Sequence, residues 1–269
     1  MRKSTWLVFF SAAFLLLLFL VAIGVPFLKI PHPREQNLAM EYFGATWAHP
    51  LGLGENGVDI LSNLLWATRL SLFVSFSSVF LSCSIGALLG ALAGLKRGFV
   101  ENLIMRFVDL FYAFPGILLV IALAAFVGPS VKNLIFVLAI TGWPSYTRVA
   151  RALVISLRER EFIVAARSLG CSDFRIVLRH LFPNLLSPLM VQASYALGAT
   201  ILTESSLSFL GIGAPVDTPS WGQMLNQGRE VMTTAPAVIF SPALALMATV
   251  LCFNLLGDGL RDFLDHKLK

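Results

Sequence analysis

The residue types that carry out chemistry are scattered along this chain. Its histidines and cysteines stand in separate segments, with neither a CxxC pair nor the helical His/Glu pairing of a metalloprotease. An enzyme or a resident metal would need a nucleophile, base or ligands that converge at one place. The sequence therefore predicts no catalytic residue, no metal site and no disulfide framework. The residues concerned are His32, His49, His180, His266, Cys83, Cys171 and Cys252.

The sequence also contains no phosphate-binding loop of the form GxxxxGK[ST]. That loop is needed to cradle nucleotide phosphates on backbone N–H groups in the P-loop manner. Any ATP, with its Mg, is therefore expected on a separate subunit, and this chain is expected to bind no cofactor itself.

The composition of the chain indicates that membrane-spanning helices are the elements that would position a functional site. The chain has 57% hydrophobic and 13% charged residues and a mean hydropathy of +0.80, outside the usual balance of a soluble domain. A hydrocarbon core about 30 Å thick takes roughly 20 helical residues to cross. We therefore expect an all-α polytopic membrane protein that forms a single domain over residues 1–269. Six transmembrane helices are predicted near residues 6–28, 70–95, 108–128, 131–152, 184–204 and 236–257.

Two of these predicted spans need comment. The first is too long for the core of a secretory signal peptide, so we interpret it as retained. The fourth, at 131–152, is the weakest, because Arg148 and Arg151 would have to extend toward the headgroups. Gly128-Pro129-Ser130 is expected to turn the chain just before it.

Basic residues set the predicted orientation. With six spans both termini share a side, and the positive-inside rule places that side in the cytoplasm, together with fifteen of the 20 Lys and Arg residues. The net charge of +5 therefore reflects topology, and no nucleic-acid partner is expected. The basic residues left outside are Lys29, Arg34, Arg69, Lys132 and Arg229.

Glu204 is the main ionisable residue associated with an apolar stretch. A charge at the bilayer centre costs roughly 2.5–3.5 kcal/mol on insertion scales. Glu204 is therefore either a hydrogen-bonded structural residue or part of a translocation pathway, with Ser194 and Gly198 on or near the same helix face. A proton- or sodium-coupled carrier would bury several such groups. Their scarcity favours an energy source elsewhere.

Small residues mark one helix contact. Gly86, Gly90 and Gly94 recur every four residues and would allow two helix backbones to approach closely. The partner helix belongs either to this chain or to a second membrane subunit.

Residues 158–183 form a charged, helix-prone segment between apolar stretches. Phe162, Ala165, Ala166 and Leu169 recur at helical spacing, and Gly170 is expected to end that helix in a left-handed conformation. Ser172 or Asp173 would cap a second helix, and Pro183 fits the first turn of the next span. The resulting helix–turn–helix has an apolar stripe, which either lipid headgroups or a groove on a soluble protein would cover.

This segment resembles the EAA loop of the membrane subunits of bacterial ABC importers. In that motif E-A-A-x-x-x-G leads after nine residues to I-x-L-P, and Ala165, Ala166, Gly170 and Pro183 match it. The departures are Val164 for the motif glutamate, and His180 and Phe182 for the Ile and Leu.

Most of the chain is similar to the C-type permease subunits of dipeptide, oligopeptide and nickel importers. The loop between the first two predicted spans matches the pattern of these subunits less well, at Leu53-Gly54 and Val58-Asp59. The matching segments are residues 51–59, 69–72, 114–115, 156–162, 208–211, 219–222 and 253–262.

The resemblance implies a type I ABC importer permease in the bacterial inner membrane, with both termini cytoplasmic. Its partners would be a homologous second permease in a heterodimer, two ATP-binding subunits that hold ATP and Mg, an extracytoplasmic substrate-binding protein and the lipid bilayer. The cargo would be short peptides, with nickel or a metal-chelate as the alternative. A stand-alone channel or an intramembrane enzyme is a more remote reading.

The same resemblance implies roles for individual residues. The translocation-pathway candidates remain Ser194, Gly198 and Glu204, and the external docking candidates are Asp59, Gly211 and Trp221. For Trp221, simple packing is an equal alternative. The residues implied to couple to the ATPase are Glu161, Phe162, Ala165, Ala166, Leu169, Gly170, Cys171, Ser172 and Pro183.

Overall fold

The computed structural model describes residues 2–28, 30–33, 35–215 and 217–267. Within these ranges the regular structure is helical, with one isolated antiparallel bridge between Leu53 and Asp59. The long helices are α1 (Arg2–Gly24), α2 (Ile60–Lys96), α5 (Val131–Leu157), α8 (Phe182–Phe209) and α10 (Ala237–Lys267). The shorter ones are α3 (Phe99–Tyr112), α4 (Gly116–Val127), α6 (Glu161–Ser168), α7 (Asp173–Ile176) and α9 (Trp221–Glu230).

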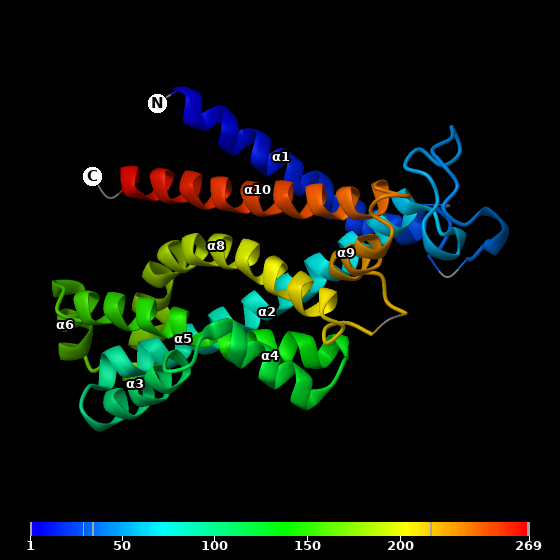
Figure 1. Cartoon of the computed structure of the whole chain (residues 1–269). Coiled ribbons are helices and arrows are strands. Elements are labelled where there is room, and N and C mark those ends of the chain that lie inside the picture. The colour runs from blue at the N-terminus through cyan, green and yellow to red at the C-terminus, as the bar shows by residue number, and fades with distance from the viewer. Residues whose placement is uncertain (1, 29, 34, 216, 268–269) are drawn as a thin grey trace.

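Short turns of other helix types complete the described structure. They are the 3₁₀ segments Val25–Phe27, Leu38–Met40 and Glu55–Gly57, and the π segment Val177–Leu181 that joins α7 to α8. Figure 1 shows α6 at one end of the helix bundle and the loop between α1 and α2 at the other. Both chain ends lie toward the α6 end. We call residues 30–59 the first loop.

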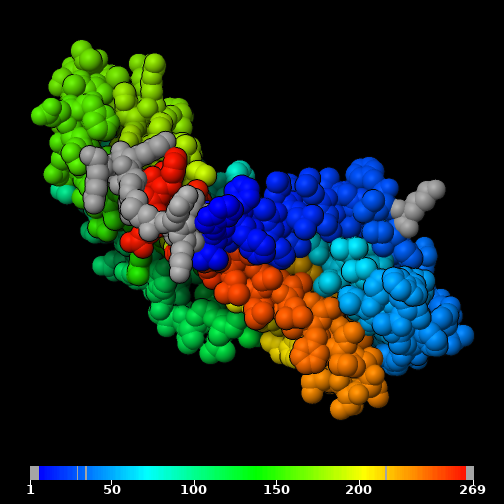
Figure 2. All heavy atoms as spheres, turned by 90° about the horizontal axis from the view of Figure 1, so that it is seen from above, coloured from blue at the N-terminus to red at the C-terminus, as the bar shows by residue number. Residues whose placement is uncertain are grey.

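Helix α1 lies on the outside of the molecule. It runs alongside α10 in Figures 1 and 2, and the two helices are in contact. Many of its apolar side chains, including Trp6, Phe9 and Phe10, are exposed in the single chain. Exposed apolar side chains along a long helix are what lipid or another membrane subunit would cover.

Among the residues that the structure describes, four segments are long and apolar enough to cross a membrane: Trp6–Phe27, Ile60–Lys96, Asp173–Phe209 and Ala237–Leu264. The pair α3 and α4 makes a fifth if it is one broken span. The chain is therefore an all-α, multi-helix membrane protein with four to five candidate spans. Helix α5 has 27 residues, which is long enough, but its polar residues keep it outside this set.

The span predicted over residues 108–128 is divided between two helices in the structure. Helices α3 and α4 are bent by 88° at the break after Tyr112. Pro115 explains the break, because its ring disfavours helical geometry at Phe114 and it has no N–H to donate. The predicted turn before α5 is confirmed: α4 ends at Val127, and the next residue, Gly128, has a φ of +81°.

The glycine repeat packs α2 against α5 within this chain. A Cβ added to Gly86 would lie 2.5 Å from the Cβ of Tyr146, and one on Gly90 would lie 2.5 Å from the Thr147 carbonyl oxygen. Such distances leave no room for a side chain. On the same side of α2, Ser82 donates a hydrogen bond to the Ala139 carbonyl oxygen at 3.0 Å. Helix α2 therefore covers part of the surface of the more polar helix α5.

Candidate functional site

The segment from α6 to the start of α8, here called the coupling loop (residues 158–183), is anchored by a few inward-facing apolar residues. Ile163 and Ile176 are fully buried and Ala166 nearly so. The turn between the helices follows the predicted chemistry, because Gly170 has a φ of +80° and the Ser172 hydroxyl accepts the Arg175 N–H at 3.4 Å. The predictions of a helix stop at Gly170 and a cap at Ser172 are confirmed.

Other apolar residues of the coupling loop point away from the protein. Leu169 is 85% exposed and Phe174 73% exposed, and Phe162, Val164 and Leu178 are exposed as well. The single apolar stripe predicted from helical spacing is therefore divided between two directions. Ala166 belongs to the inward set, whereas Phe162 and Leu169 belong to the outward set.

The remaining predicted coupling residues lie around these two sets. Glu161 is in the first turn of α6, and Cys171 donates its backbone N–H to the Ala166 carbonyl oxygen at 3.1 Å. Pro183 is in the first turn of α8, as predicted. Ala165 and Pro183 are exposed. The sequence reasoning missed Ile163 and Ile176, although the three-residue spacing from Ile163 to Ala166 marks an inward helix face.

Ion pairs fasten α3 to α5 close to the coupling loop. Arg148 donates to Asp109 at 2.9 Å and stacks over the Tyr112 ring, with the guanidinium carbon 4.0 Å from the ring centre. One turn on, Arg151 Nε donates to Glu101 at 2.7 Å. Both arginines therefore pair with acidic residues of α3, which the sequence did not predict.

Glu204 is fully buried and bound by hydroxyl groups. Its carboxylate accepts from Ser71 of α2 at 3.0 Å, from Ser208 at 2.9 Å and from Ser205 at 3.2 Å. No salt bridge to Glu204 occurs within the described residues. This arrangement supports the structural alternative for Glu204, since its hydrogen bonds join α8 to α2.

The other two pathway candidates also face this chain's own helices. Ser194 is buried, and its Cβ would lie 3.3 Å from a Cβ placed on Gly257 of α10. A Cβ on Gly198 would lie 3.5 Å from a methyl group of Val250, also in α10. Neither residue lines an open surface of the single chain.

The predicted docking residues have structural surroundings as well. Asp59 caps α2 by accepting the Ser62 N–H at 2.6 Å, and the His49 Nδ1 lies 2.6 Å from its other oxygen. Trp221 is fully buried, which supports the packing alternative. Gly211 is exposed and has a φ of +77° in the turn after α8.

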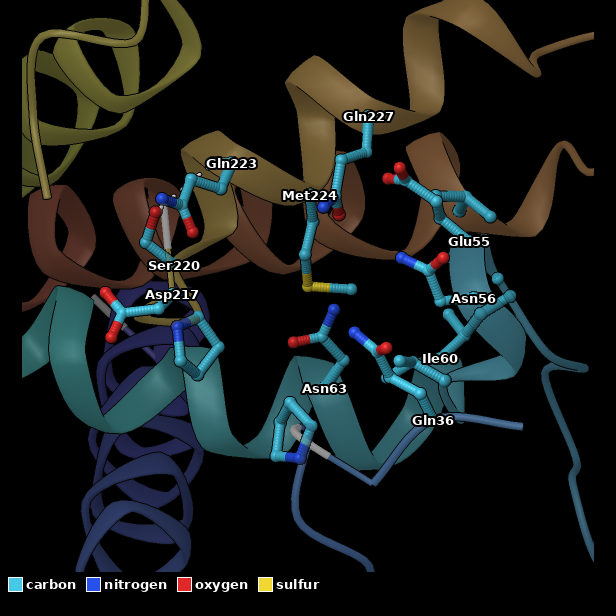
Figure 3. Close-up of a pocket in the computed structure, with 15 residues that line it drawn as sticks. Gln36, Glu55, Asn56, Ile60, Asn63, Asp217, Ser220, Gln223, Met224 and Gln227 are labelled. Carbon is cyan, nitrogen blue, oxygen red and sulfur yellow. Dashed lines mark hydrogen bonds between the residues drawn. The ribbon is translucent and has the colours of Figure 1, made fainter. Parts of the chain in front are cut away.

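A polar pocket of about 540 Å³ opens among the first loop, α2 and α9. Figure 3 shows amide side chains from these segments around the sulfur atom of Met224. Sequence reasoning missed the pocket because its lining comes from residues far apart in the chain. The amides are Gln36, Asn56, Asn63, Gln223 and Gln227.

The first loop has a defined internal structure. Gly57, at φ +68°, sits where an added Cβ would lie 2.0 Å from the Asn37 carbonyl oxygen, and Asn37 donates to the Asn56 carbonyl oxygen at 2.9 Å. The Thr46–His49 turn is closed by a backbone hydrogen bond of 3.0 Å and presents Trp47 to the solvent. A fully exposed tryptophan on an ordered loop is typical of a contact residue.

These features define a class of protein: an all-helical membrane subunit with an ordered loop at one end and an apolar coupling segment at the other. Residues 86–269 match the family described as the binding-protein-dependent transport system inner membrane component. The chain belongs to this family.

Curated relatives extend the match over nearly the whole chain. The glutathione transport system permease protein GsiD of Pectobacterium atrosepticum is 43% identical over 261 residues, covering 96% of this chain and 86% of the relative. The dipeptide transport system permease protein DppC of Alkalihalophilus pseudofirmus is 41% identical over 250 residues, covering 93% and 82%. This chain is therefore an inner-membrane permease subunit of an ABC importer.

A solved structure shows the same fold. It is an inward-facing form of the MetNI methionine ABC transporter, with a TM-score of 0.61 and 21% identity, covering 76% of this chain and 97% of that one. Family membership implies a separate ATPase and a binding protein as partners, and it argues against the stand-alone channel and the intramembrane enzyme.

Proposed function

We propose that this chain forms half of the translocation pathway of an importer for short peptides, glutathione among them. The proposed cargo is supported by the sequence identity of 41–43% to permeases named for dipeptide and glutathione transport. Nickel or a metal-chelate is the alternative cargo. Uptake of radiolabelled glutathione, a dipeptide and nickel by cells with and without this chain distinguishes them. Nickel uptake alone would overturn the peptide assignment.

The proposed architecture is a six-span subunit, with α5 as the fourth span and the α3–α4 pair as the third. Support comes from the glycine-lined contact by which α2 covers α5. The chain ends lie toward the coupling-loop end of the bundle (Figure 1), as expected if both termini are cytoplasmic. Single cysteines placed at Lys132, in the first turn of α5, and at Arg160, three residues after its end, test this. A membrane-impermeant thiol reagent should label only the first in intact spheroplasts.

The proposed complex pairs this chain with a homologous permease in the lipid bilayer and with two ATP-binding subunits that hold ATP and Mg. The outward apolar residues of the coupling loop, Leu169 and Phe174 foremost, would contact an ATPase. Such side chains are exposed at large cost in water unless a partner covers them. The inward residues Ile163 and Ile176 would transmit the ATPase movement to α8 and the rest of the bundle as a rigid-body shift.

Gly170 provides a sharp test of the coupling loop. No atom lies within 4 Å of a Cβ placed on it, so a substitution there acts through the backbone and not through a clash. Asparagine tolerates the left-handed conformation, whereas a β-branched residue does not. We expect Gly170→Val to lower peptide uptake at least tenfold and to weaken ATPase retention, while Gly170→Asn keeps most of both.

The measurement is peptide uptake together with the amount of ATPase that copurifies with the permease. Equal uptake by the valine and asparagine variants would contradict the coupling role. Loss of the valine variant from the membrane would be a folding effect. In that case Phe174→Asp, which leaves the turn intact, replaces it and must still reduce ATPase retention.

The first loop and the rim of the polar pocket are proposed to receive the binding protein. Asp59 and Trp221 would support this surface by holding the loop and α9 in place. Gly211 would support it by turning the chain after α8. Trp47 is the proposed contact residue, since buried aromatic anchors dominate many protein interfaces. Trp47→Ser should weaken capture of the peptide-loaded binding protein at least fivefold, with Trp47→Phe as the matched control. Unchanged capture by the serine variant would contradict this contact.

A further inference from the structure

A second cavity, of about 830 Å³, lies between α1 and α2. We call it the α1/α2 groove. Its walls are mainly apolar and aromatic, and its lining also includes Arg69 and, from the loop before α9, Asp217, Thr218 and Pro219. The wall residues used below are Phe19, Ile23, Phe27, Phe73 and Phe76.

The length of the groove matches one leaflet of a bilayer. The wall from Phe19 to Phe27 runs from α1 into the 3₁₀ turn Val25–Phe27, and at 1.5 and 2.0 Å per residue it is about 13 Å long. The α2 wall from Arg69 to Phe76 is about 10 Å long. Half of a hydrocarbon core is about 15 Å. At the inner end, Phe76 contacts both Phe19 and Phe253, with ring centres 5.9 and 6.1 Å apart. These contacts bring α1, α2 and α10 together there.

The length of the groove distinguishes a transmembrane helix from a lipid acyl chain as its occupant. A transmembrane helix from another subunit needs a groove that runs through the whole core, about 30 Å. An acyl chain of one leaflet needs only half that depth. The aromatic contacts at Phe76 therefore favour a lipid chain over a spanning helix.

Arg69 supplies the polar end of the site. It is exposed, and within the described residues it has no carboxylate partner. Arg69 lies within α2, and no charged residue follows it in that helix until Lys96. In the proposed orientation the uncharged part of α2 begins there, so we place the guanidinium at headgroup depth. A guanidinium binds phosphate through paired, charge-assisted hydrogen bonds.

We propose that the α1/α2 groove binds a phospholipid of the outer leaflet, with an acyl chain between Phe19 and Phe73 and the phosphate on Arg69. The proposal rests on the orientation proposed above, in which the first loop is external. A bound lipid would fill the space between α1 and the remainder of the bundle. The site lies outside the coupling loop and shares Asp217 and Pro219 of its lining with the polar pocket.

Photocrosslinking in nanodiscs tests the site on the assembled importer. The probe is phosphatidylglycerol with a diazirine on one acyl chain, and labelled peptides are mapped by mass spectrometry. We expect labels on residues 19–27 and 69–76 in the wild type. Phe73→Trp, which narrows the groove, and Arg69→Gln should each lower this labelling at least fivefold. Phe80→Trp is the matched control, because Phe80 is exposed on α2 outside the groove.

Each outcome decides the proposal. Equal labelling of Phe73→Trp and Phe80→Trp, or crosslinks from the second permease to the groove wall, would overturn it. Displacement of the lipid label from the Arg69 region by millimolar inorganic phosphate would make free phosphate the ligand instead. Peptide uptake by the same variants separates this site from the transport function: lost labelling with retained uptake concerns the lipid alone.

Discussion

Two polar clusters join helices at opposite ends of the bundle, and they use different chemistry. In the orientation proposed above, one cluster is external and the other cytoplasmic. The external cluster is the buried carboxylate of Glu204, held by hydroxyl groups of Ser71, Ser205 and Ser208. The cytoplasmic cluster consists of arginines of α5 paired with acidic residues of α3. Burial differs just as clearly, since Glu204 is 0% exposed whereas the Arg148 and Asp109 side chains are 46% and 65% exposed.

This difference shows where the bundle is fixed and where it can open. Water cannot replace the hydrogen bonds of a buried carboxylate, so separating α8 from α2 leaves polar groups unsatisfied. Exposed ion pairs contribute only about 0–1 kcal/mol each, because water solvates the separated charges. The Arg148–Asp109 contact between α3 and α5 can therefore open at little cost, whereas the Arg151–Glu101 pair is better shielded. Helix α5 leads directly into the coupling loop, so the low-cost contact lies where the ATPase movement is proposed to enter.

Of the variants that test this difference between the two clusters, Glu204→Ala should lower the stability most. It removes the acceptor for three hydroxyl groups and leaves a cavity between α8 and α2, for which we expect a loss of about 2–4 kcal/mol. The measurement is the thermal unfolding of the purified permease pair in detergent. Wild-type stability of Glu204→Ala would contradict the fixed external contact.

Glu204→Gln is the matched control and separates the two roles considered for this residue. Glutamine keeps a carbonyl acceptor for the serine hydroxyls and nearly the same volume. If Glu204 is structural, Glu204→Gln recovers most of the stability and most of the uptake. A stable variant without uptake would assign Glu204 to the translocation pathway.

Arg151→Gln should have an intermediate effect. Arg151 and Glu101 are 32% and 14% exposed, so this pair is better shielded than the Arg148–Asp109 pair. We expect a loss of about 1 kcal/mol, which 0.5 M NaCl reduces by screening. Arg160→Gln removes the same charge from an exposed position without an ion pair in the described chain and should change stability little. Equal effects of the two variants would contradict a specific role for the pair.

The sequence predicted those parts of the fold that depend on local signals. The end of α6 at Gly170, the cap at Ser172 and the turn at Gly128 each depend on the conformational preferences of one or two residues. The glycine repeat in α2 also predicted a close helix contact. It did not distinguish a contact within the chain from one between subunits, since either neighbour would be served by the same small residues.

Features that depend on tertiary packing were not predicted. The uncharged stretch continues on both sides of Pro115, so the sequence did not indicate the 88° bend between α3 and α4. Helical spacing grouped Phe162 with Ala166 on one stripe, but the inward direction is set by the helices beneath the coupling loop. The amide pocket brings together Gln36, Asn63 and Gln223 from segments that share no sequence signal.

Exchanging the charges of Arg148 and Asp109 should have the smallest effect and tests the low-cost contact directly. The single reversals Arg148→Asp and Asp109→Arg each place like charges together, and we expect losses of about 0.5 kcal/mol with uptake reduced less than twofold. The double variant restores the ion pair but leaves the Tyr112 ring without the stacked guanidinium, so its recovery should be incomplete. A double-mutant cycle of thermal stability and uptake gives the coupling energy. If either single reversal abolished uptake while the complex remained assembled, the contact would be one that must stay closed, and the cytoplasmic end would be as fixed as the cluster around Glu204.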